Sequence, residues 1–351
     1  MSTTEESRAS APPPAAPESA SKLDSPFYAG FWRRVGAFTL DALVLGVIGQ
    51  LLGLLFAHQF TMLGQSGRLV GFVIAAIYFI PAHHLWGQTL GKRLMRIRVQ
   101  ALNAGSVSVA AATLRYVALG VPWFANGVFL TAPNWPMLLL MAAAVVLGSI
   151  LLIGILGNAY LLLFNRPSRR LIHDLIAGTV VVNASSEGVA VDSDDARVAP
   201  VQWGIVGLIP VAVFAILGWV YLSSQISPTQ MAELQSAQAA LNRLPGVTGV
   251  QLLDQHNRQA GRRSHVISVQ LWVSDSNAVT DPALVRRVVA EILQKYPSSR
   301  ATDGIAVEVS RGFDIGIASL WRRNSEFYAI GGQQHTLEDP GNTCVTLVCP
   351  K

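Results

Sequence analysis

An arginine and an aspartate stand seven residues apart at the start of a long apolar stretch. Arg34 precedes residues 35–57, and Asp41 lies within them, where only Thr39 and Gln50 are also polar. Seven residues make close to two helical turns, so both side chains project from the same face of a helix. An unpartnered carboxylate inside a membrane costs several kcal/mol. The pair is therefore a candidate for proton or cation binding, or for a structural ion pair.

A second acidic candidate, Asp174, stands in the segment RLIHDLIAGTVVV. It either joins a charge network with Arg34 and Asp41 or caps a loop. Its neighbour His173 is expected to be a hydrogen-bonded partner rather than a metal ligand. No acid stands at ligand spacing from His83 and His84, so no metal site is predicted there.

The composition indicates a membrane protein. Hydrophobic residues make up 51% of the 351 residues and charged residues 13%, whereas soluble domains carry about 25% charged residues. The net charge of +5 comes from arginines and lysines at the ends of apolar runs. That placement is typical of topology signals and argues against a nucleic-acid partner. Cys344 and Cys349 are the only cysteines, and they could form a disulfide on an oxidising side of the membrane.

Five apolar segments are predicted to span the membrane. The third contains Gly120, Pro122 and Asn126, so a re-entrant segment remains the alternative. The basic loops after the second and fourth segments favour a cytoplasmic N-terminus and an extracytoplasmic C-terminal domain. The predicted spans are about 35–57, 68–86, 113–131, 137–164 and 203–222.

The first span also carries a stripe of small residues: Ala42, Gly46, Gly49 and Gly53. Small residues at this spacing let another helix approach closely within a bilayer. We therefore expect a second helix to dock against this face, beside the line from Arg34 to Asp41.

The loop GQTLGKRLMRIRVQ follows the second span. Gly91 and Lys92 resemble part of a phosphate-binding loop, but the spacing is too short and Arg93 stands where that motif needs Ser or Thr. Binding of the basic loop to anionic lipid headgroups is the better interpretation.

The remaining segments flank these spans. Residues 1–26 are predicted to be a disordered cytoplasmic tail, and residues 184–202 a linker. Residues 223–351 are predicted to form a small α/β domain, with two layers and a split βαβ-like plan. Within it, His256 and His265 are assigned to a solvated turn, and no nucleophile–base pair is recognised. We predict no enzymatic activity and no cofactor.

Four segments together resemble the RDD family of bacterial membrane proteins, over about residues 27–183. They are FYAGFWRRVGAFTLDALVL, GQTLGKRLMRIRVQ, LRY at 114–116 and RLIHDLIAGTVVV. The resemblance implies that the family's arginine is Arg34, with Arg33 as the fallback, and that its two aspartates are Asp41 and Asp174. It also implies a multi-pass protein of the bacterial inner membrane. Transport has been assumed for the family, and cation–proton antiport has been proposed for some members.

Two functions are consistent with these features, and we favour the first because acids inside a membrane are costly. In the first, Asp41 and Asp174 bind protons or small cations in a secondary transporter, which would have to form a homo-oligomer because its membrane part is small. In the second, the same residues form a structural network in a non-transporting scaffold or sensor, and the external domain binds a partner or envelope component. The two differ in whether the acids line water or are sealed against Arg34.

Overall fold

The computed structural model describes residues 27–126, 137–186, 189–191, 197–223, 227–259 and 262–330. The predicted tail at residues 1–26, the end of the predicted third span and the two cysteines Cys344 and Cys349 lie outside these ranges.

Long apolar helices form the N-terminal two thirds of the described chain. Three helical segments are long and apolar enough to cross a membrane: Phe31–Leu55, Ala57–Trp86 and Ala142–Phe164. Two further apolar stretches, Val109–Ala125 and Pro200–Ile216, are shorter. The helices concerned are α1 (Phe31–Leu55), α2 (Ala57–Leu63), α3 (Gly67–Trp86), α5 (Val109–Ala125), α6 (Met137–Leu152), α7 (Asn158–Phe164) and α10 (Pro200–Ser223).

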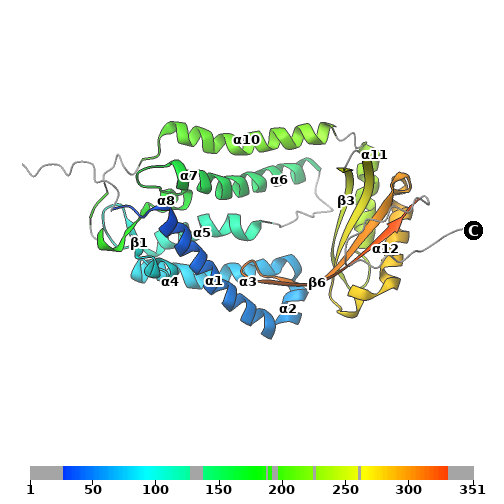
Figure 1. Ribbon diagram of the computed structural model, residues 1–351, viewed down its shortest axis with the longest axis horizontal. Helices are drawn as coiled ribbons and strands as arrows, with labels where there is room; N and C mark the ends of the chain where they lie inside the picture. The colour runs from blue at the N-terminus through cyan, green and yellow to red at the C-terminus, as the bar shows by residue number, and fades with distance from the viewer. Residues whose placement is uncertain are drawn as a thin grey trace, which may run out of the picture.

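A small ribbon and two short helices lie at one end of these helices (Figure 1). Strands β1 (Ile97–Ala101) and β2 (Thr179–Asn183) pair in an antiparallel ribbon. The helices are α4 (Leu90–Leu94) and α8 (Ile172–Ile176). The ribbon brings the loop after α3 and the loop after α7 together, although about 80 residues of chain separate them. The run of valines after Asp174 thus forms a strand.

The C-terminal domain, residues 227–330, is a two-layer α/β unit at the opposite end of the molecule (Figure 1). Its four-stranded sheet has the order β3-β4-β5-β6, and its core includes residues from both helices. The predicted split βαβ plan is wrong, because the two parallel strands β4 and β5, which flank α12, pair directly. The elements are α11 (Pro228–Leu241), β3 (Val247–Gln259), β4 (Arg262–Val273), α12 (Pro282–Lys295), β5 (Gly304–Asp314) and β6 (Ser319–Ala329).

The hairpin of β5 and β6 extends beyond the rest of the C-terminal domain. Its end lies beside α2 and α3 (Figure 1). Phe313 and Ile315 are only 3% and 0% exposed, and they cluster with Phe60 of α2. The hairpin tip is therefore buried by the helical part of the chain rather than by its own domain.

Candidate functional site

Asp174 is the centre of a buried charge cluster. It lies in α8, with 0% of its surface exposed. Arg115 of α5 donates through Nη1 to Oδ1 of Asp174, and Nη1 of Arg34 lies 3.4 Å from Oδ2. The backbone N–H of Leu171 also donates to Oδ2, at 3.0 Å. Each carboxylate oxygen thus faces a guanidinium, which compensates for the loss of water.

Arg34 also holds backbone segments together. Its guanidinium donates to the carbonyls of Ala29, Ser168, Arg169 and Val181, at distances of 2.8 to 3.1 Å. These carbonyls come from the segment before α1, the loop after α7 and strand β2. A planar guanidinium has five donors and can bind several carbonyls at once, which a lysine ammonium group could not do in the same geometry. The side chain predicted as the family's arginine therefore ties three segments together.

Arg115 belongs to the cluster although the sequence analysis did not select it. It is 4% exposed and also donates to Oγ1 of Thr179, at 2.7 Å. The LRY segment contained this arginine, and an arginine within an apolar helix was the signal that could have identified it.

The charge states of this cluster follow from its contacts. Burial alone would raise the pKa of Asp174, but Arg115 and Arg34, together with the Leu171 hydrogen bond, hold this pKa below its ordinary value. Burial lowers the pKa of His173 to about 3. Asp174 is therefore ionised at neutral pH, and the adjacent imidazole is neutral.

Asp41 forms a second, separate cluster between α1 and α4. Its Oδ1 accepts from Tyr78 Oη at 2.7 Å and from the backbone N–H of Gly91 at 2.8 Å. Its Oδ2 accepts from Thr89 Oγ1 at 2.6 Å and lies 3.8 Å from Lys92 Nζ. Asp41 is 1% exposed. The carboxylate is therefore buried, and both of its oxygens accept hydrogen bonds.

Gly91 makes the second cluster possible. A Cβ at this position would collide with the carbonyl oxygen of Ala37 and would lie 2.8 Å from Asp41 Oδ1. Glycine thus lets the short helix α4 rest on α1. Burial lowers the pKa of Lys92 to about 8, with Asp41 opposing the shift, so Lys92 remains largely protonated at neutral pH.

Arg34 and Asp41, which were expected to interact, belong to different clusters. Within the described ranges, no hydrogen bond or ion pair links Arg34 to Asp41, so the expected pair on one helix face is wrong. Arg34 binds Asp174 instead, and Asp41 binds the loop after α3. Of the supporting residues, Arg33 is exposed and donates to Asn183 Oδ1 at 2.9 Å, and Arg93 is exposed.

Two cavities lie between the charge clusters and the hairpin tip. One, of about 170 Å³, is bordered by residues of both clusters, including Arg34, Asp41, Lys92 and Arg115. The other, of about 120 Å³, is apolar. The two share four lining residues: Phe38, Phe79, Tyr116 and Leu119.

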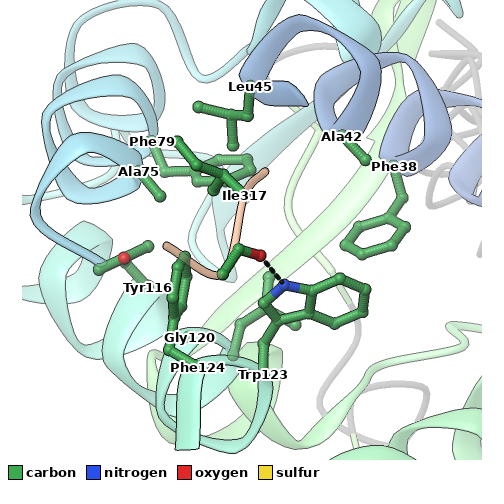
Figure 2. A pocket seen from close by; sticks show the side chains of 12 residues that line it. Phe38, Ala42, Leu45, Ala75, Phe79, Tyr116, Gly120, Trp123, Phe124 and Ile317 are labelled. Carbon is green, nitrogen blue, oxygen red and sulfur yellow. Dashed lines mark hydrogen bonds between the residues drawn. The ribbon is translucent and has the colours of Figure 1, made fainter. Parts of the chain in front are cut away.

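The hairpin closes the apolar cavity at the end away from the charge clusters. Ile317 and Gly316 line it together with Phe124 of α5. Trp123 Nε1 donates to the carbonyl of Gly316 at 3.3 Å, the contact drawn in Figure 2. The cavity is thus bounded jointly by the helices and by the C-terminal domain.

A comparison of the sequence with curated proteins gives no match. The sequence of residues 28–178 matches the RDD family, and these residues include Arg34, Arg115 and Asp174 of one cluster and Asp41, Thr89 and Gly91 of the other. The helices α10 to α12 and the sheet of the C-terminal domain lie beyond the match. Residues 28–178 of this membrane protein therefore form a domain that belongs to the RDD family.

Proposed function

We propose that this protein is a non-transporting membrane sensor or scaffold, in which the C-terminal domain is coupled mechanically to the RDD domain. The observation that carries the proposal is the insertion of the β5–β6 hairpin tip between α1, α2, α3 and α5. A domain joined only through a linker would be free to move, whereas the hairpin tip of this domain packs between the helices.

The hairpin tip packs on a surface of α1 and α3, here called the hairpin seat. Glycines on α1 form the first half of this seat. A Cβ on Gly49 would lie 2.7 Å from the Cβ of Ala318, and a Cβ on Gly53 would collide with the ring of Phe313. The predicted stripe of small residues therefore accepts a β-hairpin, and the expectation of a docked helix at this face is wrong. Close backbone approach of this kind gives dense packing over a small area.

Glycines on α3 form the second half. A Cβ on Gly71 would collide with the carbonyl of Ile315, and one on Gly67 would lie 3.0 Å from the carbonyl of Asp314. Arg68 lies between these glycines and pairs with the Asp314 carboxylate, with Nη2 to Oδ2 at 2.6 Å. Shape and charge thus fix the position of the tip.

The state of the acids argues for a structural network. A carboxylate that carries protons or cations must exchange them with water, yet Asp41 and Asp174 are 1% and 0% exposed. Each already accepts several hydrogen bonds, and Asp174 is held by two arginines. Cation binding at Asp174 would require at least one guanidinium to move away.

The proposal keeps the predicted topology of five spans in a bacterial inner membrane. The N-terminus would be cytoplasmic and the C-terminal domain extracytoplasmic. The exposed Arg33 and Arg93 would then meet anionic lipids at the cytoplasmic surface. We also propose that the protein has no enzymatic activity and acts as a homo-oligomer or with an envelope partner.

The coupling can be tested by undocking the hairpin. Gly71→Leu places a side chain where the Ile315 carbonyl lies, whereas Gly46→Ala adds a methyl group 3.8 Å from its nearest neighbour and serves as the matched control. Hydrogen exchange of the full chain in detergent would be compared. We expect faster exchange in Gly71→Leu, both in the hairpin and in α1 and α3 toward the charge clusters. Faster exchange confined to the hairpin would contradict the coupling.

Docking itself can be measured by cross-linking. Gly49→Cys and Ala318→Cys would place two Cβ atoms 2.7 Å apart, and a shift of about 1 Å brings them to the roughly 3.8 Å of a disulfide. Cys344 and Cys349 would be replaced by serine in this protein. The control pair joins Gly49→Cys to Leu253→Cys, on the exposed part of β3. Only the first pair is expected to form a disulfide in membranes.

Transport is the second candidate, and the cavity beside Arg34, Asp41 and Lys92 favours it. The test uses everted vesicles with a pH-gradient dye and added Na⁺, K⁺ or Li⁺. Wild type would be compared with Asp41→Asn and Asp174→Asn at matched abundance in the membrane. Cation-dependent collapse of the gradient in wild type, lost in both variants, would replace our proposal with antiport. We expect no cation-dependent collapse in wild type.

A further inference from the structure

Two histidines and an aspartate lie together on the β3–β4 pair of the C-terminal domain. His256 and His265 are direct cross-strand partners in the antiparallel register. Asp254 precedes His256 by two residues and so faces the same side of the sheet. The sequence analysis placed both histidines beside a turn, but the strands continue past them to Gln259 and from Arg262. The three side chains are therefore held by regular, hydrogen-bonded backbone.

The ligand atoms of the three side chains converge. One oxygen or nitrogen from each residue lies within 4.8 Å of those from the other two. Asp254 Oδ1 is 2.5 Å from His265 Nε2 and 3.8 Å from His256 Nδ1. The two imidazole rings stack with their centroids 3.9 Å apart. Around a tetrahedral ion with bonds of about 2.0–2.1 Å, neighbouring ligand atoms lie about 3.3 Å apart. Shifts of about 1 Å in side-chain position would thus produce that geometry.

A second layer of contacts orients the carboxylate. Tyr296, at the end of α12, donates its hydroxyl to Asp254 Oδ2 at 2.5 Å, which leaves Oδ1 facing the histidines. The Asp303 carboxylate accepts a hydrogen bond from the backbone N–H of His265 at 2.8 Å. The backbone N–H of Asp303 donates to the His265 carbonyl. A hydrogen bond that orients a ligand carboxylate, as the one from Tyr296 does, is typical around metal ligands.

We infer that Asp254, His256 and His265 bind a first-row divalent metal ion, with Zn²⁺ as the best match to two imidazoles and one carboxylate. The ion takes the place of the hydrogen bond between His265 Nε2 and Asp254 Oδ1. The side chain of His256 is 65% exposed, so the site is open to solvent and a water molecule completes the tetrahedron. Three protein ligands and one open position distinguish this site from a closed structural zinc site.

The test of metal binding is independent of the coupling proposed above, because it measures binding of the ion directly. The full chain would be purified in detergent with Cys344→Ser and Cys349→Ser, so that free thiols do not bind the metal. Zn²⁺ affinity and stoichiometry would be measured by calorimetry, and Co²⁺ would report geometry through its visible absorption. We expect one ion per chain and intense absorption from tetrahedral Co²⁺.

Variants then identify the ligands. His256→Ala, His265→Ala and Asp254→Asn are each expected to weaken Zn²⁺ binding at least 100-fold. Tyr296→Phe should weaken it about 10-fold to 100-fold, because that hydroxyl only orients Asp254. His58→Ala, which removes an exposed histidine of α2, is the matched control and should bind as wild type does.

A folding control distinguishes the loss of a metal ligand from unfolding of the C-terminal domain. Circular dichroism of each variant without metal should match the wild type, and His256→Ala is the key variant because His256 is exposed. If wild type binds no Zn²⁺, or if binding survives His256→Ala and His265→Ala, the inferred site is wrong.

Discussion

Arg115 of α5 and Asp174 of α8, 59 residues apart in the chain, are hydrogen-bonded through Nη1 and Oδ1. Arg34 of α1 contacts the other oxygen of the same carboxylate. One aspartate therefore joins two helices of the membrane domain to the short helix in front of β2. This arrangement makes the family's aspartate a structural centre, and it predicts large effects when its charge is removed.

Asp174→Asn should destabilise the protein strongly. The substitution leaves two buried guanidinium groups without their counter-charge, and breaking a buried ion pair in this way costs about 3–5 kcal/mol. Thermal unfolding in detergent and abundance in the membrane would both fall. Asp192→Asn removes an acid from the predicted linker and is the charge-matched control. If Asp174→Asn unfolds at the same temperature as wild type, the structural assignment fails.

Removing single donors to Asp41 should have graded effects. Thr89→Val and Tyr78→Phe each delete one hydrogen bond to a buried carboxylate, which costs about 1.5–3 kcal/mol. Thr89→Ser keeps the hydroxyl and should remain close to wild type. The measurement is the unfolding midpoint in urea at constant detergent concentration. Equal stability of the valine and serine variants would contradict the role given to Thr89.

The depressed pKa of Asp174 predicts a particular dependence on pH. A carboxyl with a lowered pKa in the folded state stabilises the fold fully above the unfolded-state pKa of about 3.9, and this contribution is lost as pH falls toward the folded-state value. The difference in unfolding temperature between wild type and Asp174→Asn should therefore stay constant from about pH 7 to pH 5 and shrink below about pH 4. A difference that already shrinks near pH 6 would show that the pKa is not depressed.

Much of the membrane domain could be predicted from the sequence, because apolar length and the positions of buried charges are strong signals. Arg34, Asp41, His173 and Asp174 all proved to be buried, as a costly polar side chain inside a protein should be. The pairing among them could not be predicted. Helical spacing placed Arg34 and Asp41 on one face, but each found better partners in loops distant in sequence.

The hairpin seat shows why part of the fold was missed. Phe313, Ile315 and Ile317 are apolar, but their sequence does not say which domain buries them, and Ile315 and Ile317 lie in the turn between β5 and β6. The glycines at positions 49 and 53 likewise predict close packing, but the expected partner was a helix and not a hairpin. Both signals were local, and only the tertiary structure showed that they meet.

The ion pair between Arg68 and Asp314 should help to fix the hairpin in its seat. Both side chains are partly exposed, at 23% and 28%, so each single charge reversal, Arg68→Asp or Asp314→Arg, should weaken docking by only about 1 kcal/mol or somewhat more. Each reversal also places like charges together. The yield of the disulfide between Gly49→Cys and Ala318→Cys would fall in both single variants.

The double variant Arg68→Asp with Asp314→Arg restores opposite charges at the same place and should recover a large part of the disulfide yield. Arg311→Asp, elsewhere on β5, is the control for reversing a charge on the same strand without touching α3, since Arg311 contacts the Ser274 carbonyl within the C-terminal domain. A double variant with a lower yield than either single variant would mean that Arg68 and Asp314 act separately. Recovery would establish that the contact between α3 and the hairpin forms in the membrane.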